Sequence, residues 1–297
     1  MARPPAPDPW LHRRRLVPTG RRAAPFKRPP ARLVRETDES PAPLPVELKL
    51  LSFNIQAGIR TERYHEYVTR GWRQVLHDPG RLPNLDRIGA VLRGYDLVAL
   101  QEVDAGSLRS GYTNQVAWLA RCAGLPFWYA QRNRRLGRLA QHGNGLLACR
   151  EPLELVDHPL PSTMIPGRGA ILARFAVEDD TPLLLVSAHL SLGPRSRDKQ
   201  LGWVAEQVAD ADRVIVMGDL NARIDDLLQR SPLKDTRLRP AAEGPLPTYP
   251  SWRPRLDLDH VLVSPGVRID GARPILCQFS DHLPLSVDVR LGAEPGG

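Results

Sequence analysis

The chain of 297 residues is predicted to be an α/β protein with mixed β-sheets. Short apolar runs bounded by turn residues outnumber the segments with helical periodicity, and helices alternate with only some of the strands. This order excludes a strict barrel of repeated strand–helix units. The composition, 42% hydrophobic and 25% charged, also excludes collagen, a coiled coil and a fully disordered chain.

Eight apolar runs are predicted to be strands, because each is short and ends at turn or polar residues. They are Leu48–Phe53, Leu97–Leu100, Gly145–Cys149, Ile171–Val177, Leu183–Ala188, Arg213–Met217, Asp259–Val263 and Leu285–Val289.

Three segments are predicted to be helices. The first follows the apolar stripe of residues 85–92, with Asn84 as its N-cap and Gly94 at its end. The second follows the stripe of residues 116–123 and also ends at a glycine. The third is expected to run from about Arg195 to Val208.

The N-terminal residues differ from the rest in proline content and charge. Residues 1–45 hold 11 of the 30 prolines, and nine arginines and one lysine against four acidic residues. Proline breaks helices and strands, so we expect residues 1–45 to be a disordered tail, 46–292 to be one folded domain, and 293–297 to be a disordered C-terminus. An electrostatic arm for acidic lipid or nucleic acid is the alternative role for the tail.

No apolar stretch approaches the roughly 20 residues that a membrane-spanning helix needs. The three cysteines are widely spaced, and their low, odd number fits a reducing compartment. We therefore expect a cytoplasmic protein without a transmembrane segment. A monomer is expected, and no protein partner can be inferred from the sequence.

Polar residues follow or precede the predicted strands at six places. They are Asn54, Gln101-Glu102, His189, Asp219 with Asn221, Asp259-His260 and Ser280-Asp281-His282. Because the start of one antiparallel strand lies beside the end of the next, these groups can share one edge of the sheets. Crowded carboxylates repel one another unless a cation or a proton relieves them.

The chemistry of these groups favours a hard divalent cation. Carboxylate and amide oxygens are preferred by Mg²⁺, or by Mn²⁺, over zinc. The sequence offers no motif for a nucleophilic serine or cysteine. The site is therefore predicted to assist the attack of water on phosphorus.

Seven segments with these residues resemble the endonuclease/exonuclease/phosphatase superfamily, the DNase I-like fold. In chain order they are LKLLSFNI, YDLVALQEV, HGNGLLACREP, VSAHLS, VIVMGDLNA, LDLDHVLVS and FSDHLPLSV. Each is weak alone, but together they extend from about Leu48 to Leu291. The resemblance, nearest to compact bacterial members without an assigned substrate, implies a four-layer αββα sandwich of two packed mixed sheets flanked by helices.

The resemblance also implies roles for individual residues. Glu102 is expected to bind the metal, with Asn54 and Asp281 as further ligands. His282 paired with Asp259 is expected to act as a base or to stabilise charge, and Asp219 to orient the attacking water. The remaining expected roles are charge neutralisation by His189 and phosphate binding by Asn221, Asn144 and Arg168.

The sequence thus predicts a divalent-metal-dependent phosphoesterase that hydrolyses a diester, with a nucleic acid strand as the leading substrate. A phospholipid headgroup diester or a phosphoinositide-like phosphate is the alternative substrate. A catalytically inactive phosphate-binding module is the third interpretation. The near-neutral charge of the folded domain and Gln56, which departs from the pattern of repair nucleases, keep the lipid alternative open.

Overall fold

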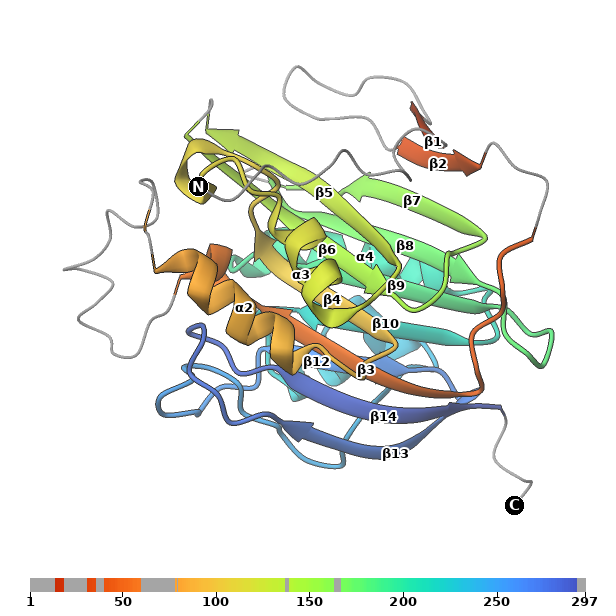
Figure 1. The fold of residues 1–297 in the computed structure, drawn as a ribbon. Helices are drawn as coiled ribbons and strands as arrows, with labels where there is room; N and C mark the ends of the chain where they lie inside the picture. The colour runs from red at the N-terminus through yellow and green to blue at the C-terminus, as the bar shows by residue number, and fades with distance from the viewer. Residues whose placement is uncertain are drawn as a thin grey trace.

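The computed structural model describes residues 14–18, 31–35, 40–59, 78, 80–136, 139–162 and 167–292. Two β-sheets pack face to face, and helices cover both outer faces (Figure 1). This arrangement confirms the predicted α/β class and the four-layer sandwich.

The first sheet has six strands, ordered β13-β14-β3-β4-β6-β5. β3 and β4 are parallel and the other neighbours are antiparallel, so the sheet is mixed. Its strands are β3 (Glu47–Asn54), β4 (Leu97–Val103), β5 (Phe127–Leu136), β6 (Ala140–Ala148), β13 (Val267–Pro274) and β14 (Leu285–Leu291).

The second sheet has eight strands, ordered β1-β2-β7-β8-β9-β10-β12-β11. It is mixed as well, because β9 and β10 are parallel. Its strands are β1 (Arg14–Pro18), β2 (Ala31–Arg35), β7 (Glu154–Pro159), β8 (Gly169–Phe175), β9 (Leu183–His189), β10 (Val214–Asp219), β11 (Arg239–Pro240) and β12 (Asp259–Val263).

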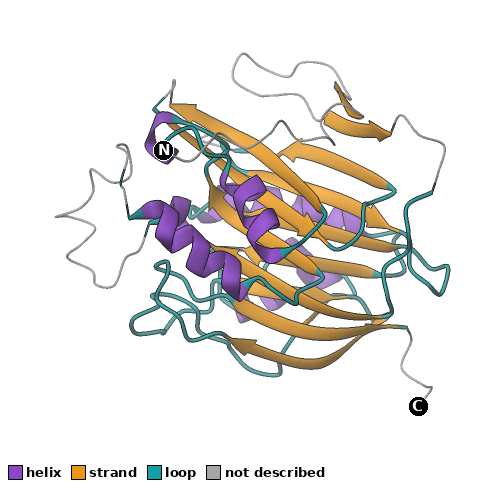
Figure 2. Ribbon diagram, viewed as in Figure 1, coloured by secondary structure: helices purple, strands orange, loops and turns teal. Residues whose placement is uncertain are grey.

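Alternation along the strands creates three apolar layers. In β3, Leu48 and Leu50 pack between the two sheets, whereas Leu51 and Phe53 pack under helices on the outer face. The helices α2 (Arg81–Val91) and α3 (Gln115–Ala123) cover the six-stranded sheet, and α4 (Pro194–Val208) covers the other (Figure 2). Strands buried on both faces explain the continuous apolar runs in the sequence.

Of the helices α2, α3 and α4, α3 alone begins with a side-chain cap. The side chain of Asn114 caps α3 by accepting hydrogen bonds from the amides of Val116 and Ala117. The prediction that Asn84 is the N-cap of α2 was wrong, because α2 already begins at Arg81. Asn84 lies inside the helix, and its amide donates to the carbonyl oxygens of Gly58 and Phe279.

The sequence missed strands β5, β7 and β13, as well as β1 and β2 of the N-terminal segment and the two-residue β11. β5 and β13 are the two edge strands of the six-stranded sheet. β7 lies near one edge of the other sheet, with β2 and β1 of the N-terminal segment beyond it. Their sequences are polar or interrupted, as in FWYAQRNRRL and VRIDGARP, because one face or edge meets solvent.

Two described pieces of the N-terminal segment are strands, and β2 pairs with β7. Leu44 is fully buried in the core and pairs with Val177, so packing begins slightly before the expected domain start. The rest of residues 1–39 and residues 293–297 lie outside the described residues, so the two disordered ends stay a prediction.

Short helical turns complete the chain: η2 (Gln56–Gly58), η4 (Leu108–Ser110), η5 (Asp226–Arg230) and η6 (Pro232–Asp235). Within the described residues, every helix is too short or too polar to cross a membrane.

The contact between α2 and α3 gives a first test of the packing. Gly89 lies in the middle of α2, where an added Cβ would overlap the Cβ of Cys122. We expect Gly89→Ala to lower the free energy of unfolding by about 1–3 kcal/mol, because the two helices must separate. Urea denaturation followed by circular dichroism measures it.

Gly202 is the matched control, since it lies inside α4 with only an ordinary contact at 3.9 Å to Pro232. Gly202→Ala should raise stability by about 0.5–1 kcal/mol through helix propensity. Equal effects of the two substitutions would contradict the close helix contact.

Candidate active site

Three neighbouring strands bring His189, Asp219 and Asp259 side by side. Asp219 ends β10 and pairs with His189, at the end of the parallel strand β9. On its other side Asp219 pairs with Asp259, at the start of the antiparallel strand β12. All three side chains are almost fully buried, so the edge of the sheet becomes a dense polar cluster.

Gly218 makes this close pairing possible. Its φ is +149°, and an added Cβ would overlap the backbone oxygen of Ala188 on β9. A side chain here would push β10 away from β9, so glycine is required for Asp219 to lie beside His189.

The six-stranded sheet contributes Asn54, at the end of β3. Its amide Nδ2 donates to Asp219 Oδ2 across the space between the sheets, at 3.0 Å. Its Oδ1 accepts from the backbone amide of Gln56, at 3.1 Å. Asn54 therefore ties the ends of the two sheets together.

Glu102 lies beside Asn54, because Asn54 pairs with Gln101 on β4. The pairing of β4 with β6 is irregular here, and Glu102 has a left-handed φ of 56°. Such a backbone is costly for a residue with a side chain and is typical of functional sites. Its partly buried carboxylate makes no hydrogen bond or ion pair to any described residue.

The pKa of Glu102 reflects the positive groups around it. Burial alone would raise the pKa, but the charges of His189, Arg168 and His282 outweigh burial and the repulsion from Asp219, and the pKa falls below its usual value. Glu102 is thus held as an anion.

His282 connects the two buried aspartates. Its Nδ1 lies 2.7 Å from Asp259 Oδ2, and its Nε2 lies 3.9 Å from Asp219 Oδ2. Asp259 Oδ2 also accepts a hydrogen bond from the hydroxyl of Thr248, at 2.5 Å. The ring of Tyr249 lies against the imidazole, with 4.8 Å between ring centroids. These contacts fix the orientation of His282.

The charges of this group stabilise one another. Burial alone would lower the pKa of His282, but the carboxylates of Asp259 and Asp219 raise it well above its usual value. Burial alone would raise the pKa of Asp219, yet it is lowered strongly by His282, His189 and the hydrogen bond from Asn54. The structure therefore holds an imidazolium beside an ionised carboxylate.

Arg168 and His189 lie on the same edge. His189 Nε2 lies 3.4 Å from Asp219 Oδ2, and Arg168 Nη1 lies 2.6 Å from His189 Nδ1. Burial lowers the pKa of Arg168, although Glu102 and Asp219 act in the opposite direction. A guanidinium thus stands among the carboxylates, where it can bind an anion.

Asn221 has one amide hydrogen left to donate. The backbone of Asn221 is left-handed, with a φ of 51°, and its backbone N–H donates to Asp219 Oδ1 at 3.1 Å. Its side-chain Nδ2 donates one hydrogen to the oxygen of Leu190. The other hydrogen has no partner among the described residues, so it can bind a phosphate oxygen.

Asp281 lies next to His282 and is nearly buried. The Ser280 hydroxyl lies 3.0 Å from Asp281 Oδ1 and 2.7 Å from the backbone oxygen of Asn54. The backbone of Asp281 is held by the amide of Ser251, at 2.7 Å. Asp281 is thus fixed close to the chain of Asn54, although it belongs to a distant segment.

Asn144 is oriented differently from a phosphate donor. Its Nδ2 donates both hydrogens inside the protein, to Gln131 Oε1 at 2.9 Å and to the oxygen of Gly169 at 2.8 Å. Gln131 is held in turn by Asp157, which accepts from its Nε2 at 2.5 Å. A contact with phosphate would need an N–H donor, and both side-chain N–H groups of Asn144 are already used inside the protein. Its position therefore favours a role in supporting the strands around the site.

The neighbours of Asp259 support the strand. His260 Nε2 contacts the oxygen of Ala222 at 2.7 Å, and Asp257 accepts from the amide of Ile224 at 3.0 Å. Both side chains hold the turn that follows β10, as expected for structural residues.

The oxygen atoms of this edge fit a hard cation. Ligand atoms of Asp219, Asp259 and His282 lie within 4.8 Å of one another, the one such group found among the described residues, but a protonated His282 has no nitrogen lone pair to offer a metal, so the carboxylate oxygens are the candidate donors. Asp259 Oδ1 is buried without a hydrogen-bond partner, and the carboxylate of Glu102 is equally unpaired within the described part of the chain. Unpaired anionic oxygens in a buried site are the donors that Mg²⁺ and Mn²⁺ prefer.

The sequence did not identify Thr248 as part of the site. It placed Ser280 among the polar groups without a specific role, and for Tyr249 it left open stacking on a base, packing on an acyl group or packing in the core. In the structure Thr248 contacts Asp259, Ser280 contacts the backbone of Asn54, and Tyr249 contacts His282. Their position just before Asp259 or His282 was the one available signal.

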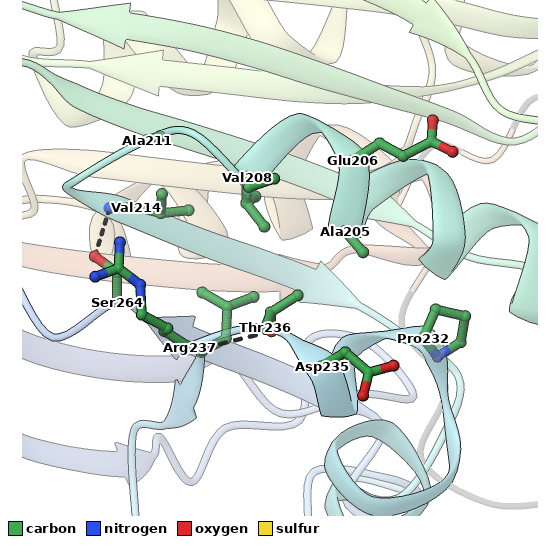
Figure 3. Close-up of a pocket in the computed structure, with 12 residues that line it drawn as sticks. Ala205, Glu206, Val208, Ala211, Val214, Pro232, Asp235, Thr236, Arg237 and Ser264 are labelled. Atoms are coloured by element: carbon green, nitrogen blue, oxygen red, sulfur yellow. Dashed lines mark hydrogen bonds between the residues drawn. The ribbon is translucent and has the colours of Figure 1, made fainter.

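A separate cavity of about 490 Å³ lies between α4, η6 and the start of β10 (Figure 3). Val214 lines it and begins the strand that Asp219 ends, so the cavity is at the opposite edge of the sheet. Its charged residues Glu206, Asp235 and Arg237 are exposed, and it belongs to no part of the site.

Known proteins resemble the chain over most of its length. The model of the Endonuclease/Exonuclease/phosphatase family matches residues 51–282. No curated protein sequence matches the chain. Solved structures match at low sequence identity, and they show the fold alone.

The endonuclease/exonuclease/phosphatase of Beutenbergia cavernae DSM 12333 matches with a TM-score of 0.64 and 21% identity, over 83% of this chain and 72% of that chain. A humanized D. rerio TDP2 with 14 mutations matches with a TM-score of 0.60 and 18% identity, over 82% and 99%. The mannosyl-6-phosphatase of Bacteroides thetaiotaomicron VPI-5482 matches with a TM-score of 0.58 and 16% identity, over 82% and 99%.

The matched range runs from Leu51 in β3 to His282, and so includes both sheets and the polar edge described above. The chain therefore belongs to the endonuclease/exonuclease/phosphatase family, whose members are phosphoester hydrolases.

Proposed function

We propose that the chain is a divalent-metal-dependent phosphodiesterase in which water attacks phosphorus in line, without a covalent intermediate. The observation that carries this proposal is the carboxylate of Glu102. It is partly buried, sits on a strained backbone where the sheets meet, and pairs with no described residue. A bound cation explains both the strained backbone and a carboxylate that makes no hydrogen bond to a described residue.

Glu102, Asn54 and Asp281 would hold Mg²⁺, or Mn²⁺, through their oxygen atoms. When bound, such an ion neutralises phosphate charge and lowers the pKa of a bound water. Asn54 Oδ1 accepts one hydrogen bond from Gln56 and keeps a second lone pair.

The protein groups divide the remaining work. Ionised Asp219 accepts a hydrogen bond from the attacking water and orients it. His282, positively charged and fixed by Asp259, stabilises the negative charge that develops on the phosphate oxygens. His189 assists this neutralisation, and Asn221 and Arg168 bind the phosphate.

Two substrate classes belong to the proposal. A nucleic acid strand is favoured by the sequence, and a phospholipid headgroup diester is favoured by apolar side chains exposed around the site. A cytoplasmic monomer is proposed for both.

Glu102→Gln tests the cation site, because it keeps the shape of the side chain and removes its charge. We expect the affinity for Mn²⁺, measured by isothermal titration calorimetry, to fall at least about tenfold. Glu178→Gln is the control, since Glu178 is exposed on the turn after β8, away from the site. Unchanged Mn²⁺ binding by Glu102→Gln would remove Glu102 from the ligand set.

His282→Ala should lower turnover by at least about 10²-fold, because it removes the positive charge that faces the phosphate. Asp259→Asn should lower turnover by about 10- to 100-fold through the orientation of His282. Steady-state kinetics on a generic diester measures both, and thermal melts check that the variants are folded. Turnover near the wild-type value in His282→Ala contradicts its role.

A substrate panel tests the activity itself. Plasmid DNA, single-stranded RNA, sphingomyelin and bis(p-nitrophenyl) phosphate are incubated with Mg²⁺ or Mn²⁺, with and without EDTA. We expect hydrolysis of at least one diester, abolished by EDTA. Hydrolysis that persists in EDTA excludes the metal mechanism, and no hydrolysis of any diester favours a phosphate-binding module without activity.

A further inference from the structure

Exposed apolar side chains gather at the edge of the sheets that carries the active site. Six large hydrophobic residues are exposed among the described residues, and five of them lie on loops or on the short helix η4 at this edge. These five are called the apolar rim: Leu108, Tyr112, Leu139, Leu192 and Leu276. The sixth, Leu153, lies between β6 and β7 at the opposite edge.

The strand topology places each rim residue. Leu108 and Tyr112 follow the end of β4, where Glu102 stands, and Leu192 follows His189 at the end of β9. Leu139 precedes β6, and Leu276 lies on the segment between β13 and the site residues before β14. These ends belong to the active-site edge because the start of β6 pairs with Val103, and the start of β14 pairs with Ser52.

The loop with Leu108 and Tyr112 is rigid. Arg109 and Asp104 form a fully buried ion pair at 2.6 Å, and Asp104 also accepts from the hydroxyl of Ser107. Tyr112 has a left-handed φ of 62° and donates from its amide to Ser107. The polar groups of the loop are satisfied beneath it, and Tyr112 is 67% exposed on top.

The loop with Leu192 is fixed in a similar way. Gln200 on α4 accepts from the amide of Ser191 at 2.8 Å and donates to its hydroxyl at 2.9 Å. Arg197 donates to the oxygens of Leu192 and Asn221, at 2.9 and 2.7 Å. Leu192 is nevertheless 73% exposed, so a well-anchored backbone presents an apolar side chain to solvent.

Exposed arginines stand beside the rim. Arg195 is three residues from Leu192, at the start of α4. Arg253 and Arg255 are exposed on the segment of Tyr249, whose ring contacts His282, and the amide of Arg255 donates to the oxygen of Tyr249 at 2.9 Å. Apolar and cationic side chains therefore surround the site together.

Single exposed hydrophobic residues are common on protein surfaces, but five of the six described ones lie at one functional edge, three of them on two tightly anchored loops, and this indicates a partner. The four leucines of the rim have neither a π-face nor a hydrogen-bonding group, so Tyr112 is the one rim residue that can stack on a nucleic acid base. Leucine and tyrosine do partition into the interface of a bilayer, and arginine binds anionic headgroups.

We propose that the apolar rim docks the active-site edge on a phospholipid membrane with anionic headgroups. The leucines and Tyr112 enter the headgroup region, and Arg195, Arg253 and Arg255 bind lipid phosphates. Docking would bring the active-site edge against phosphoesters at the membrane surface. This consequence rests on the proposed phosphodiesterase function.

Vesicle sedimentation of the full chain tests the proposal. Phosphatidylcholine vesicles with and without phosphatidylglycerol are mixed with the wild type, Tyr112→Ser, Leu192→Ser, Leu276→Ser and the control Leu153→Ser. We expect binding to the anionic vesicles, weakened by 1 M salt. Each rim substitution should lower the partition coefficient roughly tenfold, and the control should leave it unchanged.

Several results would overturn the proposal. The first is that the chain does not bind vesicles, and the second is that Leu153→Ser lowers vesicle binding as much as the rim substitutions do. The third is that the rim substitutions leave vesicle binding unchanged and instead abolish the binding of single-stranded DNA or self-association. Hydrolysis of bis(p-nitrophenyl) phosphate with Mg²⁺ is measured on the same samples. Lost docking with intact hydrolysis rejects only the membrane surface, whereas intact docking without hydrolysis rejects only the proposed function.

Discussion

The imidazole of His282 lies between two buried carboxylates, those of Asp259 and Asp219, and the rest of the site depends on this arrangement. Two neighbouring anions in a buried site repel each other, and a positive imidazole relieves the repulsion. The aspartates come from one sheet, whereas His282 comes from the segment that enters β14 of the other. The charge balance therefore exists only when the sheets are packed together, and Asn54 adds a second tie between them.

Backbone strain concentrates where the strands end. Glu102 and Asn221 both have left-handed φ values, and Gly218 lets β10 approach β9 without a steric conflict. Each strained residue follows a paired strand: Glu102 comes directly after Gln101, which pairs with Asn54, and Asn221 comes two residues after Asp219, which pairs with His189. The apolar layers provide the rigidity, and the strand ends use it to place charged groups.

The buried ion pair of Asp104 and Arg109 serves both sides of this edge. Asp104 follows β4 two residues after Glu102, and Arg109 Nη2 also donates to the oxygen of Gln141 at the start of β6. The pair thus fixes the strand end with Glu102 and, on the solvent side, the loop with Leu108 and Tyr112. Catalytic geometry and surface presentation share one structural anchor.

The main strands and the polar residues at their ends follow from the amino-acid sequence. Runs such as Leu183–His189 are apolar because both faces are buried, and a polar residue appears where the strand leaves the core. This pattern of apolar strands with polar residues at their ends predicted that Glu102, Asp219 and His282 would share one edge of the sheets. The partners of these residues emerge when the sheets pack: Asn54 donates to Asp219, Ser280 contacts the backbone of Asn54, and Asn84 donates to Phe279 from within α2 in place of capping it. A local pattern reports how deeply a residue is buried, whereas the identity of its partner depends on segments far away in the chain.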